Sequence, residues 1–380
     1  MIQDVFIIGA TGNVGKTLVS QILDEGDLNR QPIPTRIVGL ASATNFIYSP
    51  LGLDAVVATG FAKRFYFGNG MESNPYKSHD ELLSAVGLAT RDTPTQLVFV
   101  DVTPLKNEMT NFHLEVINYT PYNIVTANKN PISLSDYSTF EMLTHDVRRY
   151  GYKCSVMAGA HAVPIVQELR DLNDVPRLIE GCFSGTLGYI TSELQKGEGS
   201  FSEILAAARS EHYTEPHPRD DLSGLDVARK LIVLARTAGY RVELKDINLE
   251  PFIPNEYLAE DDISRFMSST TRLDSHFSER MKSLKDQGKT LRYVASMDAT
   301  EFPVKLGVRL SEVPLESSLG SLEGTLNKII IVSKVHPREK PYEISSQGAG
   351  PDVTAQNIRS DLLALLPKRY ANANQLQLRT

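Results

Sequence analysis

The sequence predicts an α/β protein with two parts, one built on a parallel sheet and one of α+β type built on a mixed sheet. Up to Tyr152, apolar strand-like runs alternate with amphipathic helical stretches, which is the rhythm of βαβ units. After Tyr152, longer helices and strand-like runs with period-two alternation favour a mixed or antiparallel sheet with helices on one face. A chain of 380 residues can bury a core in each part.

The elements follow from these periods. Strands are expected at 5–9, 36–42, 96–101 and 123–128, and helices at 106–119 and 135–149. The segment 45–78 has no clear period, so loops and short elements are expected there. Later come a helix from Ser223 to Gly239, a charged helical region at 260–288, strands at 291–297, 303–309 and 328–335, and a small-residue turn feeding a helix at 347–366.

Composition excludes several classes of protein. The net charge of −7 argues against a nucleic-acid-binding surface. No basic leader precedes the first apolar run and no 18 apolar residues run together, so we expect a soluble, cytoplasmic protein that does not enter a membrane. Cys154 and Cys182 lack metal-ligand spacing and are expected to be small buried residues.

A glycine-rich turn, GATGNVG at residues 9–15, joins the first strand to a helix. Backbone N–H groups and the helix dipole would meet a pyrophosphate there, which predicts a Rossmann-type dinucleotide-binding domain. The expected cofactor-binding residues of this turn are Gly9, Thr11, Gly12, Asn13, Val14 and Gly15.

The second strand ends without the acidic residue that reads the ribose of NAD. Leu40 to Thr44 contain no carboxylate, and Ser42 or Thr44 could donate to a 2′-phosphate, which favours NADP while leaving NAD possible. The alternative is that these small residues only let the turn pack closely.

The segment YTEPHPRDDLSGLDVARK (213–230) places five ionisable residues at the start of a helix that is otherwise apolar. Asp226 and Lys230 are four residues apart and share one face. The alternative is a purely structural role, in which Asp226 and Lys230 form an ordinary helix ion pair and Ser223 and Asp226 form a capping box.

The string EPxPRDDLSGxDVARK resembles the signature of homoserine dehydrogenases, which interconvert L-aspartate 4-semialdehyde and L-homoserine with a nicotinamide cofactor in threonine, methionine and isoleucine biosynthesis. The resemblance spans nearly the whole chain, and is greatest to the dehydrogenase half of bifunctional aspartokinase–homoserine dehydrogenases. It implies that Glu215, Asp221 and Asp226 bind the substrate and that Lys230 is catalytic.

Further segments carry the same resemblance. VDVTP (100–104) places Thr103 near the nicotinamide, and TANKN (126–130) places Lys129 at the site as a catalytic and cofactor-binding residue. SGTLGYI (184–190) places Gly185 and Thr186 at the substrate, and the turn before the last helix places Gly350 at the cofactor.

The resemblance also implies the domain plan. It divides the chain into a dinucleotide-binding domain (1–152), a substrate-binding and dimerisation domain (153–340) and a C-terminal segment (341–370) that returns to the first domain. The middle domain's sheet, covered on one face only, implies a homodimer.

The expected mechanism follows from hydride transfer. Negative charge develops on the carbonyl oxygen as the hydride arrives, so a cation or acid must stand there, and Lys129 and Lys230 suit this role. Which lysine transfers the proton stays open. Glu215 and Asp221 would hold the substrate's ammonium group.

One loop departs from the family. CSVMAGAHAVP (154–164) replaces VGAGLP, with an extra residue, His161 inside the loop and no carboxylate at 152–160. In relatives this region helps to hold a monovalent cation, so the departure argues against that ion here, and no other metal site is expected. His161 is predicted to be a packed or hydrogen-bonded residue instead of an acid/base group.

Three alternatives stay open. An aspartate-semialdehyde dehydrogenase also opens with GATGxVG but needs a nucleophilic cysteine, and neither cysteine lies in such a motif. A related oxidoreductase could act on another hydroxy amino acid. A non-catalytic NADP-binding homologue could lack turnover.

Overall fold

The computed structural model describes residues 2–29, 33–64, 73–90 and 96–366. The chain divides into two compact units, Met1–Gly159 with Gly350–Thr380 and Ala160–Ala349. The first unit therefore ends at Gly159 and resumes at Gly350, whereas the sequence predicts boundaries after residues 152 and 340. The last helix belongs to the first unit.

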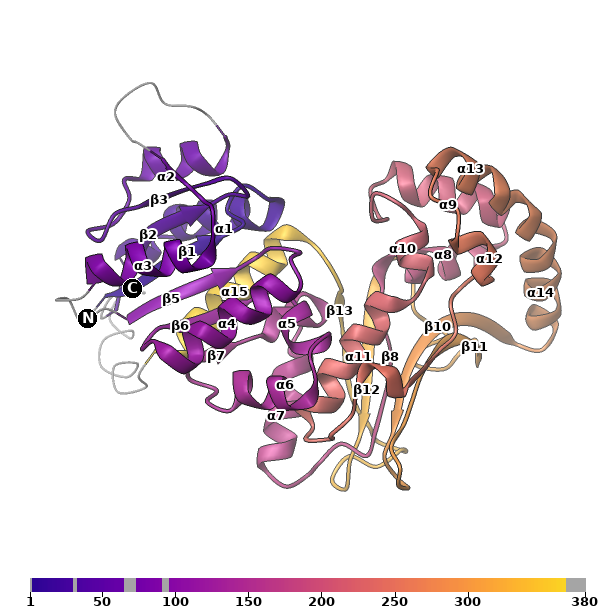
Figure 1. Cartoon of the computed structure of the whole chain (residues 1–380). Coiled ribbons are helices and arrows are strands. Elements are labelled where there is room, and N and C mark those ends of the chain that lie inside the picture. The colour runs from indigo at the N-terminus through magenta and orange to yellow at the C-terminus, as the bar shows by residue number, and fades with distance from the viewer. Residues whose placement is uncertain (1, 30–32, 65–72, 91–95, 367–380) are drawn as a thin grey trace, which may run out of the picture. The chain divides into compact units, whose positions relative to one another are not determined.

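The first unit is a seven-stranded sheet with helices on both faces (Figure 1). The strand order is β4-β3-β2-β1-β5-β6-β7, in which β2, β1, β5, β6 and β7 are parallel and β3 and β4 extend one edge in antiparallel fashion. Its strands are β1 (Gln3–Ile8), β2 (Thr35–Ala41), β3 (Asn45–Tyr48), β4 (Asn74–Pro75), β5 (Gln96–Asp101), β6 (Asn123–Thr126) and β7 (Tyr150–Gly151). Its helices are α1 (Asn13–Asp24), α2 (Ala55–Ala62), α3 (His79–Thr90), α4 (Asn107–Tyr119), α5 (Asn130–Ser133), α6 (Tyr137–Thr144) and α15 (Pro351–Ala364).

Strand β1 illustrates why the parallel strands appear in the sequence as continuous apolar runs. All of its residues are buried, because helices cover both faces of the sheet. Val5 and Ile7 belong to the core formed with α1, α2 and α15. Phe6 points to the opposite face, where its ring lies 5.6 Å from that of Phe99, which in turn meets Phe112 of α4 at 5.2 Å.

The second unit contains a six-stranded sheet of order β13-β12-β8-β10-β11-β9. All neighbouring pairs are antiparallel except β11 and β9, so the predicted mixed sheet is confirmed. Its strands are β8 (Leu178–Cys182), β9 (Ile247–Leu249), β10 (Lys289–Asp298), β11 (Lys305–Pro314), β12 (Leu326–Val332) and β13 (Tyr342–Gln347). Its helices are α7 (Ala162–Asp171), α8 (Gly185–Lys196), α9 (Phe201–Ser210), α10 (Arg219–Leu222), α11 (Leu225–Thr237), α12 (Asn255–Leu258), α13 (Ile263–Ser269) and α14 (Asp274–Asp286).

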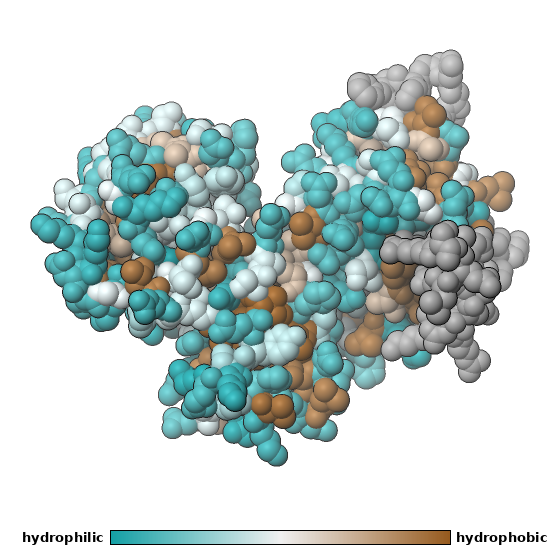
Figure 2. Space-filling view, turned by 180° about the vertical axis from the view of Figure 1, so that it is seen from behind, coloured by the Kyte–Doolittle hydropathy of each residue, from teal (hydrophilic) through white to brown (hydrophobic). Residues whose placement is uncertain are grey.

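The two faces of this second sheet differ in burial. Ile329 and Ile331 of β12 are fully buried on the face where α8 packs. Ile330 and Val332 point the other way and are only half-buried. They line a hollow of about 390 Å³. The view from behind in Figure 2 shows hydrophobic residues gathered between hydrophilic ones on the surface.

Within the part of the chain that the structure describes, no helix combines the length and the apolar character needed to cross a bilayer.

Candidate active site

Helix α11 carries the charged segment of the second unit. It begins after Gly224, whose φ of 73° is left-handed and whose backbone lies so close to the Tyr293 hydroxyl that an added Cβ would collide with it. The capping box considered from the sequence does not form, because Gly224 occupies the N-cap position. The Ser223 hydroxyl instead donates to the Asp220 carbonyl at 2.7 Å and accepts the Leu225 N–H at 3.2 Å.

The ammonium group of Lys230 is held by two acceptors. Its Nζ lies 2.9 Å from Asp226 Oδ2, one helical turn earlier, and donates to the carbonyl of Phe183 at 2.6 Å. The lysine side chain is 13 % exposed, so the charge is partly desolvated while still reachable from solvent. The expected ion pair is present, and the second acceptor gives this lysine a fixed position that a surface pair lacks.

Asp221 lies at the centre of a small hydrogen-bond network. Its Oδ2 accepts the backbone N–H of Glu215 at 2.8 Å, and its Oδ1 lies 2.8 Å from Thr186 Oγ1. The same hydroxyl oxygen lies 2.5 Å from the carbonyl oxygen of Tyr213, so its one hydrogen is shared between these two acceptors. The loop 213–221 is thereby tied to the first turn of α8.

Burial raises the pKa of Asp221 to about 6. The hydrogen bonds from Glu215 N–H and Thr186 lower it, while the nearby charges of Glu215 and Asp226 raise it further. Asp221 and the two other acids, Glu215 and Asp226, form a negatively charged group that suits a cationic ligand group.

Helix α8 begins with small residues beside this acidic group. Ser184 caps the helix by accepting the Leu187 N–H at 3.2 Å, and Gly185 follows as the first helical residue. At Gly188 an added Cβ would lie 3.1 Å from the carbonyl of Gly324, so there is little room for a larger residue. The second unit thus brings together Gly185, Thr186, Asp221, Asp226 and Lys230, with Glu215 contributing its backbone N–H.

The first unit contains a cleft of about 780 Å³ at the carboxyl ends of β1, β2 and β5. Five of the expected cofactor residues line it: Gly9, Thr11, Gly12, Ser42 and Thr103. Asn13, Val14, Gly15, Lys129 and Gly350 are not among its lining residues. The carboxyl edge of a parallel sheet is where such folds bind their ligands.

The glycine-rich turn fits a dinucleotide. Gly9 has a φ of 90°, and the Gly12 N–H donates back to its carbonyl at 3.0 Å. An added Cβ at Gly15 would collide with the backbone of Gly9 and Ala10, so only glycine lets α1 begin this close to the strand. Helix α1 begins at Asn13, with Val14 in its first turn. Its first N–H groups are the donors that a pyrophosphate needs.

The Ser42 hydroxyl forms hydrogen bonds within its own turn, residues 42–45. It donates to the carbonyl of Asn45 at 3.1 Å and accepts the N–H groups of Thr44 and Asn45. Two cations that the sequence analysis did not single out, Arg64 and Lys77, line the same cleft. Both lie within the segment 45–78, which has no clear period, so no local pattern indicates a role for them.

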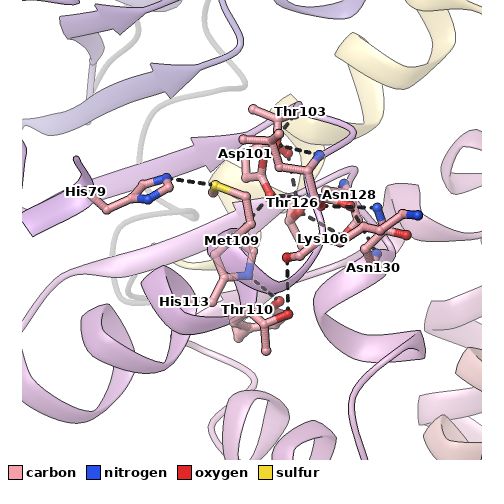
Figure 3. Close-up of polar contacts among 12 residues, drawn as sticks. His79, Asp101, Thr103, Lys106, Met109, Thr110, His113, Thr126, Asn128 and Asn130 are labelled. Carbon is pink, nitrogen blue, oxygen red and sulfur yellow. Dashed lines mark hydrogen bonds and ion pairs between the residues drawn. The ribbon is translucent and has the colours of Figure 1, made fainter. Parts of the chain in front are cut away.

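Thr103 belongs to a polar network at the ends of β5 and β6 that also contains Asp101, Asn128 and Asn130 (Figure 3). Asp101 accepts the Thr103 N–H at 2.8 Å and an N–H of the Asn128 side chain at 3.0 Å. Asn128 in turn accepts the backbone N–H of Asn130 at 3.0 Å. Lys129 lies between these asparagines and is the N-cap residue of α5.

The altered loop after β7 has unusual backbone conformations. Met157, Ala158 and His161 all have φ values between 51° and 57°, which are costly for residues other than glycine. Asn357 of α15 donates to the Ala158 carbonyl at 2.9 Å. Gly350, with a φ of 136°, begins α15, and its carbonyl accepts the Thr354 hydroxyl at 2.7 Å. Among the described residues, no group of three or more potential metal ligands was found.

Both cysteines are free and buried, as expected. Burial raises the pKa of Cys182 to about 12 and that of Cys154 well above its ordinary value. Thiols of this kind stay protonated, which argues against either as the nucleophile that an aspartate-semialdehyde dehydrogenase requires.

Comparisons with known proteins agree with this geometry. A bifunctional aspartokinase/homoserine dehydrogenase from Buchnera aphidicola is 30 % identical over 95 % of this chain, which spans 42 % of that relative. A protein of unknown function from Candida auris has a similar crystal structure, with 25 % identity, a TM-score of 0.83 and coverage of 96 % and 98 % of the two chains.

A hyperthermophilic archaeal homoserine dehydrogenase in complex with NADPH shares the fold, with a TM-score of 0.68, 18 % identity and coverage of 96 % and 98 % of the two chains. The family model for homoserine dehydrogenase matches residues 164–363, which is more than half of the 380 residues. The matched region contains Thr186, Asp221, Asp226 and Lys230. This chain therefore belongs to the homoserine dehydrogenase family.

Proposed function

We propose that this protein is an NAD(P)-dependent homoserine dehydrogenase that interconverts L-aspartate 4-semialdehyde and L-homoserine. The observation that carries the proposal is the anchored ammonium group of Lys230, bound by Asp226 and the Phe183 carbonyl. The chain spans less than half of the Buchnera relative, so the activity is an inference from the site and the family. It would serve threonine, methionine and isoleucine biosynthesis, in the cytoplasm.

In the proposed reaction, Lys230 stabilises the oxygen that changes between carbonyl and alkoxide. A fixed cation at that oxygen lowers the barrier because its charge meets charge that exists only in the transition state. Asp226 keeps the ammonium group in place between turnovers. A bound nicotinamide would supply or accept the hydride.

The carboxylates of Asp221 and Glu215 are assigned to the ammonium group of the substrate. Asp221 is already fixed by Thr186 and by the Glu215 N–H, so it needs no rearrangement to accept a charged donor. Glu215 is exposed and can approach the same group from the solvent side. Lys129 is assigned to the cofactor side of the site. It comes directly after Asn128, which is hydrogen-bonded to Asp101.

We further propose that the cofactor is NADP rather than NAD. The cleft that would hold the ribose contains no carboxylate from the end of β2, and it contains the cations Arg64 and Lys77. A 2′-phosphate carries charge that these cations would neutralise. Asp80, Glu108 and Glu115 also line the cleft, and they belong to its α3 and α4 wall.

We also propose that the protein forms a homodimer through the open face of the second sheet. Leu178, Ile330 and Val332 line the hollow on that face. An apolar sheet face of this kind is stabilised when a second copy covers it, because both copies then lose the same apolar surface to water.

The activity is tested with the purified full chain. Oxidation of L-homoserine is followed at 340 nm with NADP and, separately, with NAD, beside L-serine, L-threonine and other hydroxy amino acids. The proposal expects L-homoserine with NADP to give the highest kcat/KM. A higher value for another hydroxy amino acid would favour the related oxidoreductase. Binding of NADPH without turnover on any of these substrates would favour the non-catalytic homologue.

A further inference from the structure

A buried chain of three polar side chains runs through the first unit behind the cofactor cleft. It joins Asp101 at the end of β5, His113 in the middle of α4 and Tyr150 in β7. His113 Nε2 lies 3.3 Å from Asp101 Oδ2, and His113 Nδ1 lies 2.8 Å from the Tyr150 hydroxyl oxygen. Asp101 and His113 are fully buried, and Tyr150 is 2 % exposed. Figure 3 places His113 and Asp101 in the same group of polar side chains.

We infer that His113 is a positioning residue for the cofactor site, because it fixes Asp101, which in turn fixes the turn that carries Thr103. The inference rests on the proposed function insofar as the cleft binds a nicotinamide cofactor. It assigns no chemical step to His113.

The first step of the argument concerns the tautomer of His113. Burial raises the pKa of Tyr150 well above its ordinary value, so the phenol keeps its hydrogen and can donate it to Nδ1. The ring hydrogen then lies on Nε2, which faces the carboxylate of Asp101. The opposite tautomer would direct a nitrogen lone pair at the carboxylate, and the two would repel each other.

The second step concerns the cost of burying Asp101. A fully buried carboxylate is unfavourable unless its oxygens are hydrogen-bonded or paired. Oδ1 accepts the Thr103 N–H, and Oδ2 faces both the Asn128 amide and His113. Asn128 makes the hydrogen bond to Oδ2, while His113 Nε2 lies beside the same oxygen at 3.3 Å without hydrogen-bond geometry. Removing the imidazole therefore takes the positive end of its N–H dipole away from a buried carboxylate.

The third step links Asp101 to the cleft. The Asp101–Thr103 hydrogen bond sets the first turn after β5, and the Leu105 N–H donates to Thr103 Oγ1 at 3.3 Å. Asn128 holds the same turn from the other side by donating to the Leu105 carbonyl at 2.8 Å. Thr103 and Leu105 both line the cleft, so a shift of Asp101 changes the wall against which the cofactor would lie.

The experiment compares variants at position 113 in the full chain. His113→Leu removes the Nε2–H group that lies beside Asp101, whereas His113→Gln keeps an amide N–H in its place. The dissociation constant for NADPH is measured by its fluorescence, and KM values for NADP and homoserine are measured where turnover occurs. We expect His113→Leu to raise both cofactor constants roughly tenfold or more, since the buried carboxylate of Asp101 loses the polar group beside it and the turn that it holds can shift. His113→Gln should stay within about threefold of wild type, and the KM for homoserine should change little in either variant.

The control is Phe140→Leu, which trims a buried ring of the same unit outside the Asp101 network. It should lower thermal stability without changing the cofactor constants. If His113→Leu does not fold, His113→Asn replaces it, because its amide is too short to reach Asp101 and should lose affinity where His113→Gln keeps it. Unchanged NADPH affinity in the leucine or asparagine variant would overturn the inference, as would equal losses in the glutamine variant.

Failure of the proposed function looks different in the same experiment. A wild-type chain that binds NADPH but does not oxidise homoserine refutes the dehydrogenase assignment, while the comparison of NADPH affinities between His113 variants still decides the inference. A wild-type chain that does not bind NADPH refutes both.

Discussion

Lys230 differs from most lysines on helices because two acceptors define the position of its charge. In the fold, its ammonium group bridges α11 and the end of β8 through the Phe183 carbonyl. An ordinary i, i+4 pair contributes only about 0.3–0.5 kcal/mol, so stability alone gives little reason to bury this stem. A cation held in place beside a group of acids supports the proposed catalytic role.

Lys230→Ala should therefore lower kcat for homoserine oxidation by ~100-fold or more, because the developing alkoxide loses its cation. The Kd for NADPH and the circular dichroism spectrum should not change. Lys282→Ala, which removes an exposed lysine of α14 in the same unit, is the matched control and should leave kcat unaltered. Near-normal turnover in Lys230→Ala would remove this lysine from the mechanism.

Asp226→Asn should act in the same direction with a smaller effect. The asparagine can still accept a hydrogen bond from Lys230, but the charge that anchors the ammonium group is gone. Steady-state kinetics would show a decrease in kcat. An Asp226→Asn variant more active than wild type would mean that the ion pair restrains the lysine instead of positioning it.

The pKa of Asp221 predicts a pH dependence. This pKa is raised to about 6, so the carboxyl group gains a proton as the pH falls through that value and then no longer attracts an ammonium ion. The kcat/KM for homoserine should fall below about pH 6 in wild type. Asp221→Asn should lower kcat/KM at all pH values and lose this limb of the profile. Persistence of the same limb in Asp221→Asn would assign it to another group.

At the scale of single elements, we propose that the end of β2 and the cations beside it favour NADP over NAD. Ser42→Asp places a carboxylate in the cleft and should weaken NADP binding more than NAD binding, because it would repel a 2′-phosphate. Arg64→Ala should have the same selective effect through loss of a cation. Fluorescence titrations with both reduced cofactors test this, and equal losses for the two cofactors would show that this strand end does not read the ribose.

The loop 157–161 predicts the response to monovalent cations. No carboxylate occurs at 152–160, and the Ala158 carbonyl already accepts an N–H of Asn357. We therefore expect no specific dependence on sodium or potassium. Rates are compared at fixed ionic strength with sodium, potassium or a bulky organic cation. A specific loss of rate in the organic cation would indicate that backbone carbonyls alone bind the ion.

The elements that could be predicted from sequence are those whose burial pattern is local. The strand expected at 96–101 is β5 with the same bounds, because a strand covered on both faces is apolar throughout. Strands β3 and β4 were not predicted individually, since their antiparallel pairing depends on β2 and on residues far along the chain. The expected helix at 135–149 is shorter, as α6 ends at Thr144.

In the candidate site, too, the residues that can be predicted are those whose relation is set by local sequence. Asp226 and Lys230 are recognisable because their spacing places both on one helical face. Arg64, Lys77 and His113 could not be identified, because each acquires its neighbours only when the sheet assembles. The sequence indicates that the Ser42 hydroxyl could donate to a 2′-phosphate. Its hydrogen bonds with the Thr44 and Asn45 N–H groups form only in the folded turn, so the sequence does not reveal them.

At the scale of the whole molecule, the half-exposed face of the second sheet predicts the oligomeric state. Ile330 and Val332 lie on this face, and covering them with a second copy would remove apolar surface from water. Light scattering of the wild-type chain should give the mass of a dimer. Ile330→Asp should shift the distribution to monomers, whereas Val147→Asp, at an exposed position of the first unit, should not. A monomer at all concentrations of wild type would contradict the homodimer.

The return of α15 to the first unit sets an order of events during synthesis. Ala355, Ile358 and Leu362 of this helix complete the core around β1, and Arg359 binds the buried Asp27 through two hydrogen bonds of 2.7 and 2.8 Å. A nascent chain that has produced only the first 159 residues lacks these groups, so its nucleotide-binding half waits with an open apolar face while the 190 residues from Ala160 to Ala349 are translated. The core of the first unit can therefore be completed only after the whole second unit has been synthesised.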